Sequence, residues 1–331
     1  MTASSSPVDR VSSFLGHFYT IAPVARHIVR PRPVSPSSAF RVVVHDPDVG
    51  RVRLSGRLHH APSDTLLVVV HGLGGDVGSH YVLDAAAAGD AAGVAVLRVH
   101  LRGADRTGED IYHAGVSHDV HFMLASPHLQ RYSRIVLMGY SLGGHIVLRA
   151  ATERDLDPRV AAVAAICPPL DLVRGAEAID EPARYVYRRH VLESIKEVYA
   201  AVARRRGMHL PVSEVRRIGT LREWDERVVA PRFGFRGADH YYTEMRVSTR
   251  LRLLSVPSLL IAARHDPMVP AHTLAPVLEA DVPNLHVRWM DRGGHVGFPS
   301  NIDIGDAAPG QFEPQVVSWL LSQDKRSVTA P

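Results

Sequence analysis

Short apolar runs alternate with helix-like segments from about residue 41 onward, and this alternation restricts the fold more than any other feature. The runs TLLVVVHG, VAVLRVHLRG, RIVLMGYS, VAAVAAICPPL and PSLLIAARHD are short and mostly apolar, and LHVRWMD closes the series. Continuous apolar runs of this length are typical of parallel strands that are buried on both faces. RVVVHD and RVRLSGRL, which precede them, are expected to pair as antiparallel strands. The sequence therefore predicts an α/β fold with a mostly parallel central sheet flanked by helices.

The alternation breaks once, between Asp171 and about Arg250. The segment EPARYVYRRHVLESIKEVYAAVARRRG has a charged face and an apolar face, with Pro182 suited to the first turn and Gly207 to the end. The apolar face is formed by Leu192, Ile195, Tyr199 and Val202. Ligands of α/β sheets bind outside the carboxyl ends of the strands. A helical insertion over residues 171–250 is therefore expected to act as a lid.

This insertion divides the expected core into two parts, residues 41–170 and 251–325. Residues 1–40, which end in the Pro/Ser-rich stretch PRPVSPSS, are expected to form an N-terminal arm packed on the core. Residues 326–331 are expected to be a tail. No internal repeat is visible in the sequence.

Composition and charge exclude several classes of function. The chain of 331 residues has a formal charge of +4, and only Lys196 and Lys325 are lysines among its basic residues. The sequence contains no cluster of basic and aromatic residues of the kind that would predict a nucleic-acid-binding surface. The single cysteine, Cys167, excludes an internal disulfide and a cysteine metal cluster, and is expected to be a core residue.

The sequence also bears on where the protein acts. It has no basic-then-apolar signal at its start and no apolar stretch near the ~20 residues that span a bilayer. A soluble cytoplasmic protein without a transmembrane segment is expected. Peripheral membrane contact through residues 1–40 or the insertion stays open, and no feature of the sequence indicates an oligomeric state.

The pentapeptide GYSLG, Gly139–Gly143, lies where an apolar strand becomes a helix. It fits the pattern G-x-S-x-G, in which a serine sits on a tight strand-to-helix turn with its hydroxyl exposed. The two glycines avoid side-chain clashes in that turn, and the helix N-terminus favours developing negative charge. Ser141 is therefore predicted to be a nucleophile, although a tight turn that happens to contain a serine is the alternative.

A serine nucleophile needs a histidine base that is oriented by an acid, and in this architecture the chain order is serine, acid, histidine. Asp266 follows the buried run SLLIAA, and His295 follows the next strand in a glycine-rich loop. We predict these two as acid and base. His265 and Asp291, also at strand ends, are the nearest alternatives.

The glycine-rich segment HGLGG, residues 71–75, follows another buried strand and can bring backbone N–H groups close to a ligand. The N–H groups of Leu73 and Leu142 are the predicted donors to an oxyanion. A flexible turn is the alternative. A phosphate cradle is excluded because no Lys-Ser/Thr follows and G-x-G-x-x-G is incomplete. No zinc-ligand spacing such as H-E-x-x-H is present, so neither a metal nor a cofactor is expected.

Together these segments resemble the α/β-hydrolase superfamily, and more narrowly its AB hydrolase 4 branch of YheT-like bacterial hydrolases and their eukaryotic ABHD relatives. The resemblance runs from about residue 16 to residue 320. Its most specific blocks are GHFYTIAP at 16–23, HGLGG at 71–75, HLRG at 100–103, IYHAGVSHD at 111–119, the segment 221–242 and GGHVGF at 293–298.

This resemblance implies a serine hydrolase of short-chain or lipid acyl esters, with Ser141 as nucleophile, Asp266 as acid and His295 as base. An acyltransferase that uses the same acyl-enzyme remains an alternative, as does a non-catalytic ligand-binding protein on the same scaffold. Arg102 and Asp119 are expected to be structural partners near the site. The chain departs from the branch pattern at four positions, which are Ala114, Ser117, Ala230 and His240.

Overall fold

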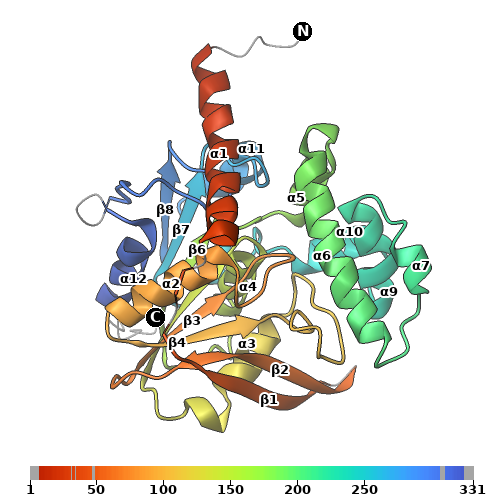
Figure 1. The fold of residues 1–331 in the computed structure, drawn as a ribbon, viewed down its shortest axis with the longest axis horizontal. Coiled ribbons are helices and arrows are strands. Elements are labelled where there is room, and N and C mark those ends of the chain that lie inside the picture. Colours follow the sequence, from red (N-terminus) through yellow and green to blue (C-terminus); the bar gives the residue numbers. More distant parts are fainter. Residues whose placement is uncertain (1–6, 31, 34, 47–48, 306–309, 324–331) are drawn as a thin grey trace.

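An eight-stranded sheet forms the centre of the protein (Figure 1). The computed structural model describes residues 7–30, 32–33, 35–46, 49–305 and 310–323. The strand order is β1-β2-β4-β3-β5-β6-β7-β8, in which β1, β2 and β4 pair antiparallel and all other neighbours are parallel. The predicted mostly parallel sheet is confirmed. The strands are β1 Ser38–Asp46, β2 Gly50–His59, β3 Thr65–Val70, β4 Ala95–His100, β5 Arg134–Tyr140, β6 Val160–Ile166, β7 Ser258–Ala263 and β8 Leu285–Met290.

Helices cover both faces of this sheet, which explains why its central strands are mostly apolar. In β3, Leu66, Val68 and Val70 belong to one apolar cluster, together with side chains of α3 (Ser117–Leu124) and α4 (Leu142–Ala151). Leu67 and Val69 point the other way, into a second cluster with α2 (His80–Ala91) and α12 (Phe312–Ser322). The inner strands β3 to β7 are therefore buried on both sides, whereas the edge strand β8 is only partly buried.

The expected insertion, residues 171–250, is helical in the structure. It contains α5 Leu172–Asp180, α6 Tyr185–Ala203, α7 Val212–Val215, α8 Leu221–Trp224, α9 Ala230–Arg232 and α10 Ala238–Met245. The apolar face predicted for α6, formed by Leu192, Ile195, Tyr199 and Val202, is buried. The helix ends at Ala203, short of Gly207, and is followed by a turn in which the N–H groups of Arg205 and Arg206 both donate to the carbonyl of Val202. After β7, one more helix, α11 (Ala271–Leu278), precedes β8.

The expected N-terminal arm contains one continuous helix, α1 (Pro7–Val29), which projects from the body of the protein (Figure 1). Pro23 lies inside this helix. The strand β1 takes in residues 38–40 at the end of the expected arm. The first six residues of the arm, and the tail at residues 326–331, lie outside the described residues. No described helix is long and apolar enough to cross a membrane.

Arg102 is buried in a cluster of carboxylates beside the sheet. Its Nε donates to Oδ2 of Asp119 at 3.0 Å, and a terminal nitrogen donates to Oδ2 of Asp46 at 2.8 Å. Burial disfavours the charged guanidinium, but these hydrogen bonds outweigh it and raise the pKa of Arg102 above its usual value. The expectation that Arg102 and Asp119 are structural partners is confirmed.

Candidate active site

Ser141 occupies a strained turn between β5 and α4. Its φ of 52° and ψ of −120° lie in a region that L-residues rarely adopt. The conformation is held because the Ser141 N–H donates to the carbonyl of Ile166 at 2.7 Å. A Cβ on Gly143 would collide with the carbonyl oxygens of Val70 and His71, and one on Gly139 with the carbonyl of Gly143. The structure thus confirms that both glycines of the pentapeptide are needed for steric reasons.

His295 and Asp266 follow the neighbouring strands β8 and β7 and meet at the carboxyl edge of the sheet. Nδ1 of His295 lies 2.9 Å from Oδ2 of Asp266, and both side chains are buried. The other carboxylate oxygen, Oδ1, accepts from the N–H groups of Met268 and Val269 at 2.8 and 2.9 Å. Asp266 is therefore fixed in orientation. In a neutral imidazole this arrangement places the proton on Nδ1 and leaves Nε2 as an acceptor.

The HGLGG loop after β3 lies directly against this serine, since a Cβ on Gly72 would come within 2.9 Å of the Ser141 Cβ. The carbonyl of Gly72 is held by two groups, Nδ1 of His71 at 2.8 Å and the N–H of Gly75 at 3.1 Å. Because a trans peptide points its C=O and N–H in opposite directions, fixing this carbonyl also fixes the N–H of Leu73. Within the described chain, the N–H groups of Leu73 and Leu142 donate to no other residue.

His71 holds that carbonyl as a neutral imidazole. Its Nε2 accepts from the N–H of Leu101 at 3.0 Å, so the proton lies on Nδ1 and is donated to Gly72. Complete burial lowers the pKa of His71 to about 4, which keeps the ring neutral near pH 7. A single His before a glycine-rich loop has no distinctive spacing, so this role of His71 could not be predicted from the sequence.

Two tyrosine hydroxyls bind the remaining N–H groups of the loop. Gly72 donates to the hydroxyl of Tyr81 at 3.1 Å, and Gly74 donates to that of Tyr112 at 2.8 Å. Tyr81 lies nine residues after Gly72 and Tyr112 lies 38 residues after Gly74, and neither spacing forms a recognised local pattern. They restrict the loop on either side of Leu73.

Helix α1 supports the loop that carries His295 from outside the sheet. The backbone N–H of His295 donates to Oγ1 of Thr20 at 2.8 Å, and Thr20 in turn donates to the carbonyl of Gly16 at 2.8 Å. A Cβ on Gly16 would collide with the carbonyl of His265. The positions of Gly16 and Thr20 in GHFYTIAP thus have a structural reason that the sequence alone does not reveal.

In the described chain neither sequence-level alternative, Asp291 or His265, makes a side-chain hydrogen bond to Ser141, Asp266 or His295. Asp291 is largely exposed and pairs with Arg264 at 2.8 Å. His145 on α4 is buried, and its ring nitrogens contact the carbonyls of Pro169 and Met245. Cys167 is also buried, and burial raises the pKa of its thiol well above the usual value. A protonated thiol packs as an apolar core residue, as predicted.

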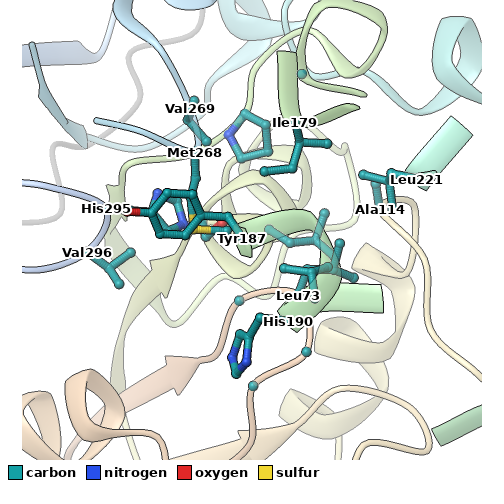
Figure 2. A pocket seen from close by; sticks show the side chains of 18 of the residues that line it. Leu73, Ala114, Ile179, Tyr187, His190, Leu221, Met268, Val269, His295 and Val296 are labelled. Atoms are coloured by element: carbon teal, nitrogen blue, oxygen red, sulfur yellow. The ribbon is translucent and has the colours of Figure 1, made fainter. Parts of the chain in front are cut away.

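Ser141, His295, Leu73 and Leu142 line one cavity of about 520 Å³. Figure 2 shows His295 and Val296 on one side of it, with Leu221 and Ala114 on the other. The insertion provides much of the remaining wall, and α1 provides a further part. The apolar lining includes Ile21, Val24, Leu172, Ile179, Val186, Val191, Met268 and Val269. A volume of this size suits a small organic ligand that is mostly apolar.

Only one of the four positions that depart from the branch pattern touches this cavity. Ala114 lines it, and its N–H donates to the hydroxyl of Tyr241 at 2.8 Å. Ser117 is buried and donates to Glu153, whereas Ala230 is buried in the insertion. His240 packs against Phe235.

Asp225 is a buried carboxyl in the cavity wall, at the start of a π-helical turn (Asp225–Val229). Burial raises its pKa to about 7, although the hydroxyl of Tyr242 donates to it at 2.7 Å. In an unfolded chain its pKa is near 4. The folded state therefore holds this proton more tightly, and stability falls as pH rises from about 4 through 7.

The change Asp225→Asn tests that inference. It keeps an oxygen for Tyr242 but cannot ionise. Relative to wild type, its free energy of unfolding should rise by about 2–3 kcal/mol between pH 5 and pH 8.5, measured by urea unfolding at both values. The exposed Asp239, which pairs with Arg222, supplies the control, and Asp239→Asn should show no such change. Equal differences at both pH values for Asp225→Asn would show that Asp225 is ionised throughout.

Comparison with known proteins gives consistent similarities. The sequence model of the alpha/beta hydrolase fold matches residues 65–301. The putative esterase YheT of Escherichia coli is 29% identical over 245 residues, covering 70% of each chain. Phospholipase ABHD3 of Mus musculus is 25% identical over 167 residues, which cover 50% of this chain and 40% of that protein. Among solved structures, the esterase Pf2001 of Pyrococcus furiosus is similar at a TM-score of 0.51 and 16% identity, covering 80% of this chain and 88% of that one.

Proposed function

Because the chain belongs to the alpha/beta hydrolase fold family, we propose that it is a serine hydrolase that cleaves carboxylic esters. The observation that carries the proposal is the 2.9 Å contact between His295 and Asp266, beside a cavity that His295 shares with the strained Ser141. Similarity to proteins named as esterases and phospholipases supports the same class of reaction.

The first half of the proposed reaction forms an acyl-enzyme. Nε2 of His295 accepts the proton of Ser141 as the serine oxygen attacks the ester carbonyl. Asp266 holds the imidazole in the tautomer that leaves Nε2 free, and it stabilises the imidazolium that forms. The N–H groups of Leu73 and Leu142 bind the oxyanion. The C–O bond of the ester then breaks, and the leaving alcohol takes the proton from His295.

The second half transfers the acyl group to water. His295 removes a proton from the water as it attacks the acyl carbonyl, and the same N–H groups bind the second oxyanion. Ser141 leaves with the proton that His295 returns to it. An alcohol or thiol acceptor in place of water would make the enzyme an acyltransferase, with the same residues and the same first half.

The apolar cavity supports an acyl group with an appreciable hydrocarbon chain. Its wall offers aliphatic side chains from α1, the insertion and the loop after β7, including Ile21, Ile179 and Val269. Each methylene that moves from water into such a wall contributes about 0.8 kcal/mol. Both short-chain esters and lipid acyl esters satisfy this chemistry, and the cavity favours the longer ones.

A series of 4-nitrophenyl esters that differ only in acyl length tests the proposal. We expect kcat/KM to rise by about tenfold or more from the two-carbon to the eight-carbon acyl group, because the added methylenes enter the apolar cavity. A burst of 4-nitrophenol equal to the enzyme concentration would report the acyl-enzyme. Product analysis with added glycerol separates hydrolysis from acyl transfer. If no ester gave either turnover or a burst, that result would contradict the proposal.

A further inference from the structure

Exposed apolar side chains gather on two helices next to the cavity. In the described part of the chain, eleven large apolar side chains are exposed, and only Val43 and Leu253 lie elsewhere. The other nine belong to α1 and to the first turn of α6. They are Phe14, Leu15, Phe18, Ile21, Val24, Ile28 and Val29 on α1, and Tyr185 and Val186 on α6. We call this set the apolar face.

On α1 the apolar face lies opposite the side that packs on the protein. Phe14, Phe18, Ile21 and Ile28 follow spacings of four, three and seven residues, which align them along one side of a helix. The opposite side carries Gly16, Thr20 and Pro23, which contact the loop around His295. The exposed fractions of Phe14 and Ile28 are 70% and 74%. Figure 1 shows this helix projecting beyond the rest of the fold.

The charge around this face is positive. Residues 11–45 contain no Asp or Glu but four arginines, at positions 26, 30, 32 and 41. Arg26 on α1 and Arg30 directly after this helix are exposed, and Arg189 is exposed on α6 close to Val186. The nearby Glu181 pairs with Arg184, and Asp84 pairs with Arg32. An apolar surface bordered by arginine is complementary to a layer of anionic lipid headgroups over hydrocarbon.

The apolar face is continuous with the cavity that contains Ser141. Ile21, Val24 and Val186 belong to both. At this edge, Nδ1 of His17 on α1 lies 2.6 Å from the hydroxyl of Tyr187 on α6, so the two helices meet there. A surface that covers the apolar face therefore also lies at the entrance of the cavity.

We propose that the apolar face binds the surface of an anionic lipid bilayer, with α1 lying on the membrane and the cavity opening toward it. No described helix could span the bilayer, so contact is confined to the interface. Binding to lipid does not depend on the proposed ester hydrolysis. The further consequence, that substrate enters the cavity from the membrane, rests on that proposed function.

Co-sedimentation of the full chain with vesicles tests the proposal. Wild type should bind mixed vesicles that contain equal amounts of phosphatidylcholine and phosphatidylserine. It should bind vesicles of pure phosphatidylcholine less strongly. The double variant Phe18→Ser, Ile28→Ser should lower the apparent affinity for the mixed vesicles by about tenfold or more, because two large apolar side chains are lost. The matched control Val43→Ser, Leu253→Ser removes two exposed apolar side chains elsewhere and should bind like wild type.

Two further measurements separate the possible failures. Turnover of a short water-soluble ester and thermal unfolding should be the same for all three proteins, which shows that the fold and the site are intact. Vesicle binding remains readable even if no ester is cleaved, so loss of the proposed function would not be mistaken for loss of docking. Wild type that stays in solution with the mixed vesicles would overturn the proposal. So would a wild-type dimer that only Phe18→Ser, Ile28→Ser dissociates, since a second copy would then cover the face.

Discussion

Replacement of Ser141 by alanine should lower kcat for ester hydrolysis by about 10⁶-fold, because the acyl-enzyme can no longer form. A residual rate about 10³-fold above the uncatalysed reaction is expected from the oxyanion donors and binding alone. The same change should abolish labelling by a fluorophosphonate probe. Turnover and labelling can be measured on the same preparation.

Ser194 provides the control for this experiment. It lies on α6 against the HGLGG loop, because a Cβ built on Gly74 would come within 2.9 Å of the Ser194 Cβ. Ser194→Ala should keep both turnover and labelling. Wild-type turnover in Ser141→Ala, or labelling that is lost only in Ser194→Ala, would remove Ser141 from the mechanism.

The change Asp266→Asn should lower kcat by about 10⁴-fold while the protein stays folded. The backbone N–H groups of Met268 and Val269 both donate to Oδ1, so the asparagine oxygen is expected to take that position. Its NH₂ group then faces Nδ1 of His295, which must act as an acceptor. The ring proton moves to Nε2, and the imidazole can no longer accept the proton of the serine.

Asp291, the nearest sequence-level rival, is the matched control for that change. It is exposed and pairs with Arg264, so Asp291→Asn should leave kcat within about twofold of wild type. The kcat values of the two variants, measured at one pH with one ester, decide between the carboxylates. A large loss in Asp291→Asn with little loss in Asp266→Asn would transfer the role of acid to Asp291.

The strands of the core could be predicted because a strand that is buried on both faces has apolar residues at consecutive positions. Leu66–Val70 is apolar at every position, since alternate residues enter two different apolar clusters. The proposed nucleophile, acid and base could be chosen because each follows such a strand, at the edge where α/β folds bind ligands. The contact between His295 and Asp266 is what that reasoning expects.

Other features of the site depend on contacts that leave no local pattern. Tyr112 binds the N–H of Gly74 across 38 residues of sequence, and Thr20 binds that of His295 across 275. The neutral state of His71 follows from burial by the whole fold. The exposure of the apolar side of α1 could not be predicted either, because an amphipathic pattern predicts that apolar residues face the core. Here they face away from it.

Three residues with unfavourable backbone conformations adjoin one another at the carboxyl edge of the sheet. Ser141, Cys167 and Val296 have φ values of 52°, 49° and 54°, and each conformation costs about 1–3 kcal/mol in the folded state. Glycine would relax any of the three. At Ser141, however, glycine would remove the proposed nucleophile, and at Cys167 and Val296 it would remove a buried side chain and leave a cavity. A protein engineer should leave these three residues fixed and look for added stability elsewhere in the chain.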